Sequence, residues 1–102
     1  MEGRGYYKNT IKNVMQIFSL LQEAEKSGEL LTVSKISKIT GLHKWTVSRT
    51  LDIYMAPYVE ISVPDGFEDV GLKIKFVRLK NTAMTKEQVL RFLDLKTLTF
   101  SL

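Results

Sequence analysis

The residues best suited to bind a negatively charged partner are concentrated between positions 32 and 49. This segment contains no acidic residue, and its basic residues are Lys35, Lys38, Lys44 and Arg49. The whole chain is far more balanced, with 15 Lys and Arg against 11 Asp and Glu and a formal net charge of +4. Lysine binds phosphate as a point charge, and arginine also matches the paired acceptors on guanine. The segment is therefore the first candidate for an anion-binding surface.

Residues for catalysis or metal binding are sparse. His43 is the single histidine and the chain has no cysteine, so the sequence offers no convincing catalytic triad and no zinc cluster. Asp65, Glu68 and Asp69 do not have the spacing of a calcium loop, and no glycine-rich phosphate loop or dinucleotide fingerprint occurs. The sequence predicts neither an enzyme nor a cofactor, and no small-molecule effector is evident.

Length and composition predict one domain with a partner. A chain of 102 residues buries less of its surface than a longer one, so we expect a second subunit before a second domain. The absence of cysteine fits a reducing compartment. No apolar run approaches the ~20 residues that span a bilayer, and the start MEGRGYYKNT lacks the apolar core of a signal peptide. We expect a cytoplasmic protein with no membrane partner.

Apolar periodicity predicts a long first helix. From a cap at Asn9 or Thr10, apolar residues recur at three- and four-residue steps as far as Leu21. Gly28 is expected to end the helix, because glycine readily adopts the left-handed conformation that follows many helices. Residues 1–9 are then expected to form an N-terminal arm.

Two shorter helices are predicted next, separated by a glycine. A short extended piece at 29–33 leads into a helix that Thr32 can cap. Gly41 breaks this helix, and a third begins at about residue 44. Pro57 cannot continue the third helix, because it lacks an amide proton and its ring clashes with the preceding turn. The result is a pair of short helices joined at a glycine.

Alternating apolar residues predict a β-hairpin. Residues 58–63 and 72–80 alternate between apolar and polar types, and the loop 64–71 between them contains two glycines and a proline. The expected register places Glu60 opposite Lys75. The apolar phase shifts near the end of the second strand, which indicates a bulge or the end of the strand.

A final helix has a clear start signal. Thr85 and Gln88 form a capping-box pattern, and Met84 and Val89 stand where a hydrophobic staple would place them. Residues 98–102 alternate like a short strand. Because this C-terminal region is strongly apolar, we expect it to form the dimer interface through Val89, Phe92, Leu93, Leu98 and Phe100. The outer face of the first helix is the second choice, and the tail folding back on its own domain remains an alternative.

The order of these elements is that of a winged helix-turn-helix domain. The segment ITGLHKWTVSRTLDIY, which begins at Ile39, resembles the turn and recognition helix of winged-helix transcription regulators of the MarR-like kind. The chain is also similar to small regulators of archaea and their viruses. The resemblance implies an α+β fold with a three-helix core and a hairpin wing in residues 10–80, and a C-terminal helix and tail in 84–102. It also implies sequence-specific binding of double-stranded DNA by a homodimer, in the cytoplasm of the cell or of a viral host.

The same resemblance assigns roles along the third helix, whose exposed amino-terminal end would meet base edges in the major groove. The expected base contacts are Lys44, Trp45, Thr46, Ser48 and Arg49. The expected phosphate contacts, which add affinity without reading sequence, are Lys35, Lys38, His43, Lys73 and Lys75.

Each assignment has a simpler alternative. Arg49 can pair with Asp52 on the helix surface, Trp45 can lie flat over the second helix, and Lys75 can pair with Glu60 across the strands. The lysines can form an ordinary solvated face. The hairpin tip, DGFED, is acidic where wings that enter DNA are usually basic. A winged-helix module that binds protein and no nucleic acid is therefore the alternative function.

Overall fold

The structure, a computed structural model, describes the backbone of residues 2–63 and 75–101 and the side chains of residues 8–63 and 75–93. Within these residues the fold is α+β, with four helices and one three-stranded antiparallel sheet, which confirms the expected class. The elements are α1 (Glu2–Ser27), β1 (Leu31–Thr32), α2 (Val33–Thr40), α3 (Lys44–Tyr54), β2 (Val59–Ser62), β3 (Phe76–Leu79) and α4 (Lys86–Ser101).

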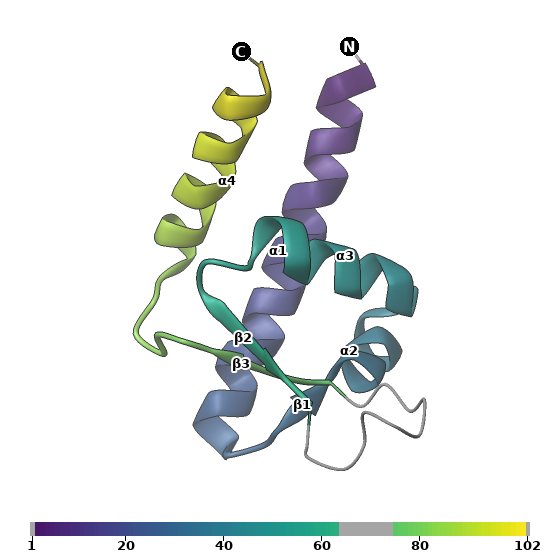
Figure 1. The fold of residues 1–102 in the computed structure, drawn as a ribbon, viewed down its shortest axis with the longest axis vertical. Coiled ribbons are helices and arrows are strands. Elements are labelled where there is room, and N and C mark those ends of the chain that lie inside the picture. The colour runs from purple at the N-terminus through teal and green to yellow at the C-terminus, as the bar shows by residue number, and fades with distance from the viewer. Residues whose placement is uncertain (1, 64–74, 102) are drawn as a thin grey trace.

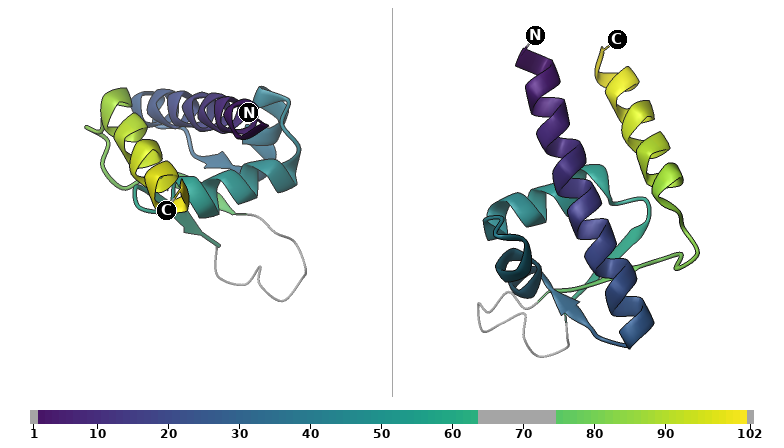
Figure 2. Two further views of the ribbon diagram at one scale, coloured as in Figure 1. Left: turned by 90° about the horizontal axis from the view of Figure 1, so that it is seen from above. Right: turned by 180° about the vertical axis from the view of Figure 1, so that it is seen from behind.

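The long helix α1 organises the other elements. Figure 1 shows α3 and the sheet in front of α1, α2 to the right of it, and α4 beside its amino-terminal half. The rear view in Figure 2 shows α1 crossing the sheet and the back of α3, with both chain termini at the same end of the molecule. The apolar stripe of α1 is buried in this arrangement and consists of Val14, Ile17, Phe18, Leu21 and Ala24.

The helix α1 begins earlier than the sequence indicated. It starts at Glu2 and contains 26 residues, so Asn9 and Thr10 lie inside it and neither caps it. The expected N-terminal arm, residues 1–9, is therefore helical from residue 2 onward. Extending an existing helix adds one hydrogen bond for each residue fixed, which is why the helix passes the polar residues that looked like a start.

The helix pair α2 and α3 forms as predicted. The hydroxyl of Thr32 accepts a hydrogen bond from the backbone N–H of Lys35 at 3.1 Å and caps α2. Gly41 ends α2 with a φ of 78°, in the left-handed region. Val33 and Ile36 of α2 and Val47 of α3 are buried in the shared core. The glycine bend therefore holds α3 at a defined angle to α2.

The register of the sheet differs from the predicted one. The strand order is β1-β3-β2, and Glu60 stands opposite Arg78 rather than Lys75. A cross-strand pair between Glu60 and Lys75 is therefore wrong. The register follows the apolar side chains that must share one face, because Ile61 lies opposite the buried Val77. In the sequence the apolar positions shift to Val77 and Leu79 near the end of the second strand. These two residues are buried and form the inner face of β3.

The start of α4 is confirmed and its end is corrected. The backbone N–H of Thr85 donates to Oε1 of Gln88 at 2.9 Å, and the N–H of Gln88 donates to the Thr85 hydroxyl at 3.3 Å. Met84 and Val89 are both buried, as a hydrophobic staple requires. The helix then continues to Ser101, so the tail is not a strand. Two periods of alternation are too short a signal to outweigh propagation of a helix already formed.

None of the described helices is long and apolar enough to cross a membrane.

Candidate nucleic-acid interface

The turn between α2 and α3 is held by short-range hydrogen bonds. The N–H of Gly41 donates to the carbonyl of Ser37 at 2.9 Å, and the N–H of Leu42 donates to the hydroxyl of Thr40 at 3.1 Å. The Ser37 hydroxyl donates to the Leu42 carbonyl. Because side chains from α2 satisfy the polar groups of the turn, the start of α3 is fixed relative to α2.

His43 caps α3, a position where most helices have Ser, Thr, Asp or Asn. Its Nδ1 accepts a hydrogen bond from the N–H of Trp45 at 3.1 Å. An accepting Nδ1 carries no proton, so the proton of the neutral ring is on Nε2. The imidazole is exposed, and its Nε2–H is thus available to donate to a phosphate oxygen. The expected phosphate role of His43 is compatible with its role as a cap.

Trp45 lies on the outside of α3. Its side chain is 64% exposed, so the alternative in which the ring is buried over α2 is wrong. The guanidinium of Arg49, one turn further along, lies 5.3 Å from the centre of the indole ring, within the range of a cation–π contact. The two side chains form one exposed unit on the surface of α3.

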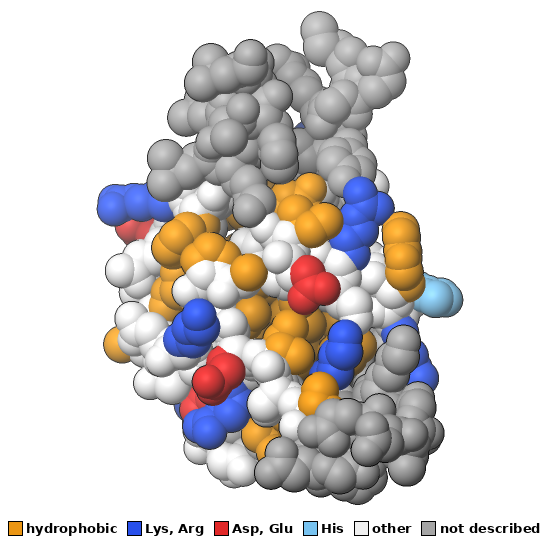
Figure 3. Space-filling view, viewed as in Figure 1, with side chains coloured by type: hydrophobic (Ala, Val, Ile, Leu, Met, Phe, Trp, Pro, Cys, Tyr) orange, Lys and Arg blue, Asp and Glu red, His pale blue; other side chains and the backbone are white. Residues whose placement is uncertain are grey.

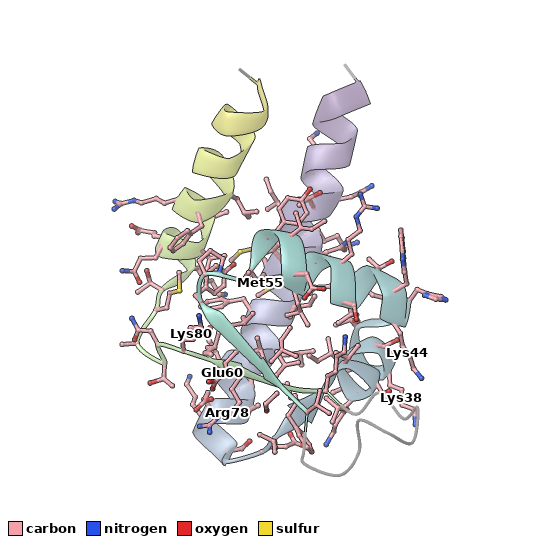
Figure 4. All side chains as sticks on the ribbon, viewed as in Figure 1. Lys38, Lys44, Met55, Glu60, Arg78 and Lys80 are labelled. Carbon is pink, nitrogen blue, oxygen red and sulfur yellow. The ribbon has the colours of Figure 1, made fainter. Side chains whose placement is uncertain are left out.

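The cations nearest the turn are not neutralised by acidic neighbours. Within the part of the chain that the structure describes, Arg49 makes no ion pair with Asp52 or with any other acid, and neither do Lys38 and Lys44. Figure 4 shows Lys38 and Lys44 pointing outward on the same side of the molecule. Figure 3 shows Lys and Arg side chains over α2 and α3, at the right of the view. This side can attract an anion without first breaking an ion pair.

The remaining expected phosphate contacts differ from this group. Lys35 forms an ion pair with Glu29, so its charge is already partly neutralised. Lys75 is half-buried, and its carbonyl accepts a hydrogen bond from the N–H of Val33 at 3.2 Å, which places it beside the start of α2. Lys73 and the acidic tip of the hairpin, residues 65–69, lie outside the described residues.

The other expected base contacts lie along the flank of α3. Thr46 and Ser48 are half-buried, whereas Lys44 is exposed. The carbonyl of Thr46 accepts a hydrogen bond from the hydroxyl of Thr50 at 2.7 Å. The Thr46 hydroxyl makes no hydrogen bond to another described residue. The structure therefore brings the five expected base contacts onto one helix, with the two small hydroxyl residues set deeper than the three long side chains.

The expected dimer contacts separate into two groups. Val89 and Leu93 are 0% and 1% exposed, so both belong to the core and cannot form the surface of an interface. They face inward because α4 packs its apolar edge against the rest of the domain. Phe92 is 38% exposed, and the neighbouring Leu90, which sequence reasoning did not single out, is 39% exposed. The side chains of Leu98 and Phe100 lie outside those described.

A hollow between α1 and α3 was not foreseen. It has a volume of about 220 Å³, and its lining consists of Asn9, Thr10, Asn13, Trp45, Thr46, Arg49, Thr50 and Tyr54. Polar side chains of α1 therefore stand beside the exposed end of α3. The sequence contained no signal for the hollow itself, although residues 3–22 include no aspartate or glutamate.

Comparisons of the chain with protein-family models, with curated proteins and with solved structures find no match. The chemistry of the site rests on its own geometry. One helix end presents ammonium, guanidinium and indole groups to solvent beside two half-buried hydroxyl residues, and no acid among the described residues pairs with its cations. These groups can donate hydrogen bonds to phosphate and to base edges, and they can stack on flat apolar surfaces.

Proposed function

We propose that the chain is a winged helix-turn-helix protein that binds double-stranded DNA as a homodimer and regulates transcription. The order of helices and strands and the β1-β3-β2 sheet are compatible with this fold, in which α2 and α3 form the helix-turn-helix and β2 and β3 form the base of the wing. A rigid helix is the right size for the task, because the major groove is about 12 Å wide and admits one α-helix.

The observation that carries the proposal is the exposed and unneutralised end of α3. Lys44, Trp45 and Arg49 project from the first two turns of a helix whose opposite face is buried in the core. Trp45 is 64% exposed and lies against the guanidinium of Arg49, so this helix end offers a large aromatic side chain to a partner together with its cations. The proposed position of α3 in the major groove gives this side chain an apolar partner, such as a thymine methyl group or a deoxyribose.

The roles of the side chains follow from their chemistry. Arg49 binds the two acceptors of a guanine, and Thr46 and Ser48 donate to a base edge or a phosphate. Lys44 also donates to a base edge, whereas Lys38 and His43 bind phosphates and contribute affinity that does not depend on sequence. The same division predicts which changes alter sequence preference and which alter affinity alone.

A homodimer supplies the second recognition helix. Two-fold dimers place two such helices about 34 Å apart, one turn of DNA, so that both meet the same face of the duplex. In this chain α4 and the amino-terminal half of α1 extend side by side beyond the sheet (Figure 1). Leu90 and Phe92 of α4 are both more than one-third exposed; they lie on different faces of the helix, and Leu90 is the first candidate for contact with the second copy.

Selection of bound sequences from random duplex DNA tests the proposal most directly. The protein is expected to enrich a sequence with two related half-sites. If six phosphates are neutralised, the logarithm of the affinity falls with the logarithm of the salt concentration with a slope of about −5. Arg49→Ala is expected to weaken binding of the enriched sequence. Arg91→Ala, which removes an exposed arginine from α4, is its matched control. Binding that is absent at low salt, or that does not respond to salt, overturns the proposal and leaves the protein-binding module as the better account.

A further inference from the structure

The middle of α1 lies beside both helices that flank the turn, α2 and α3. On one side of α1, Asn13 lines the hollow of about 220 Å³ together with Trp45 and Arg49 of α3. On an adjacent face of α1, Lys12 lines a second hollow, of about 500 Å³, together with Glu23 of α1 and Thr40 at the end of α2. Consecutive residues of α1 therefore reach the two helices that flank the turn.

This part of α1 carries a second set of donors for anions. Lys8 and Lys12 are exposed and one helical turn apart, and Asn9 and Asn13 form a parallel row beside them. We call these four residues the α1 strip. Within the described residues neither lysine makes an ion pair, and the chain has no acidic residue between positions 3 and 22. In the described part of the chain, unpaired positive charge therefore lies on α1 as well as on α2 and α3, and Lys12 borders the same hollow as the end of α2.

We infer that the α1 strip is a second phosphate-binding surface, which holds the sugar-phosphate backbone at the edge of the groove that α3 enters. This inference rests on the proposed function. It adds α1, which lies outside the helix-turn-helix, to the DNA interface. In this role α1 increases the affinity for DNA but does not discriminate between base sequences.

From its position, the α1 strip would contact phosphates of the DNA rather than bases. An α-helix with its side chains is about 10–12 Å across and fills the major groove. A helix packed against it, with axes about 8–10 Å apart, therefore stands over the wall of the groove, where the phosphates lie. Lysine ammonium and asparagine amide groups are donors that commonly contact phosphate oxygens. Asn9 and Asn13 border the same hollow as Arg49, so one duplex can touch both helices.

Removing both lysines tests the inference. The double variant Lys8→Ala/Lys12→Ala is compared with Lys26→Ala/Lys86→Ala, which removes two exposed lysines from the far end of α1 and the start of α4. Affinity for the selected duplex is measured across a series of salt concentrations. The strip variant is expected to reduce the steepness of the salt dependence by about 2, close to 1 for each lysine that no longer binds a phosphate. The control is expected to leave it unchanged.

A second variant tests the hollow without removing a cation. Asn13→Asp places a carboxylate beside the duplex, and Asn81→Asp makes the same change at an exposed turn that precedes α4. Asn13→Asp is expected to weaken binding of all sequences alike and to preserve the order of preference among them. Circular dichroism and thermal unfolding check that each variant folds.

The outcomes separate the inference from the proposed function. If the unaltered protein binds duplex DNA and the strip variant has the same salt dependence, the α1 inference is wrong and the proposed function stands. If the strip variant changes the association state of the protein without DNA and leaves duplex affinity intact, α1 is a protein contact and the inference is wrong. If the unaltered protein does not bind duplex DNA at all, both are wrong.

Discussion

The guanidinium of Arg49 lies 5.3 Å from the centre of the Trp45 ring, on the exposed side of α3. The contact joins residues one helical turn apart, and both side chains remain largely outside the core. Stacking restricts a long, flexible arginine to fewer conformations before any partner arrives, so binding costs less conformational entropy. Trp45 therefore acts in the proposed function both as a contact and as a support for Arg49.

Replacing Trp45 tests whether its ring holds the side chain of Arg49 in place for binding. Trp45→Leu keeps an apolar side chain but removes the cation–π contact, which contributes about 0.5–1 kcal/mol at an exposed site. We expect a two- to fivefold loss of affinity for the preferred duplex, with thermal stability unchanged. Trp45 is the single tryptophan, so its fluorescence reports the contact directly. If Arg49→Ala leaves the emission of the free protein unaltered, the two side chains do not stack in solution.

Substitutions of Arg49 and Lys38 are expected to affect DNA binding in different ways. Arg49→Ala removes a contact to a base and should relax the preference at one position by about 1–3 kcal/mol. Lys38→Ala removes a phosphate contact and should weaken all sequences to the same extent. Competition between the selected duplex and single-base variants of it measures both effects. Identical behaviour of the two variants would contradict the division of roles.

Gly41 is expected to matter because of its left-handed backbone conformation, and not because a larger side chain would clash with a neighbour. Its φ is 78°, and a Cβ built there meets nothing within 4 Å. Gly41→Ala therefore introduces no clash with a neighbour and costs about 1–2 kcal/mol through the left-handed conformation. Gly41→Asn, which tolerates this conformation better, should cost less. Chemical denaturation ranks the three proteins, and equal stability of all three would show that the turn does not hold this conformation.

Tyr58 is expected to make stability sensitive to alkaline pH. Its hydroxyl is buried without a hydrogen-bond partner among the described residues, and burial raises its pKa above the ordinary value of 10.0. Below pH 10 the group is neutral in both the folded and the unfolded chain. Above pH 10 the unfolded chain loses the proton first, so the folded state loses stability as the pH rises, by about 1.4 kcal/mol at pH 11.

Tyr58→Phe removes that sensitivity and keeps the ring contacts with Phe18 and Phe92. The variant is expected to be more stable than the original protein by about 1 kcal/mol near neutral pH, because a buried hydroxyl without a partner is destabilising. The difference should widen between pH 9 and pH 11. Urea unfolding at the two pH values measures it, and a difference that does not change with pH would place the hydroxyl in contact with solvent.

Two leucines one helical turn apart on α4 are expected to respond differently to substitution. Leu93 is 1% exposed, and Leu93→Ala should lower the free energy of unfolding by about 2–5 kcal/mol. Leu90 is 39% exposed, and Leu90→Glu should leave the fold intact while weakening the proposed homodimer. Analytical ultracentrifugation and thermal unfolding separate these effects. A Leu90→Glu protein with an unchanged association state would exclude this face of α4 from the interface.

The features predicted well from sequence depend on short stretches of chain. The Thr32 cap, the Gly41 bend and the reciprocal bonds of Thr85 and Gln88 each involve residues within a few positions of one another. Their geometry is set by local backbone and side-chain chemistry, so residue type and spacing are sufficient to identify them. The basic segment around the glycine was found for the same reason.

The features predicted wrongly depend on how long an element continues or on which residues meet across the fold. The start of α1 and the end of α4 were placed at polar or alternating residues, whereas the helices run through them. Val89 and Leu93 were assigned to a dimer surface because apolar periodicity shows that a face is buried but does not show what covers it.

Residue types and their spacing were enough to predict the α+β class, the order of the elements, the caps and the concentration of uncompensated positive charge near Gly41. Packing in three dimensions was needed to show that Glu60 faces Arg78, that Trp45 stays exposed and that Asn13 of α1 stands beside Arg49 of α3. The difference lies in the range of the interactions. Caps and turns form within a few residues, whereas register, exposure and contact between distant helices are set by how apolar faces pack together across the whole chain.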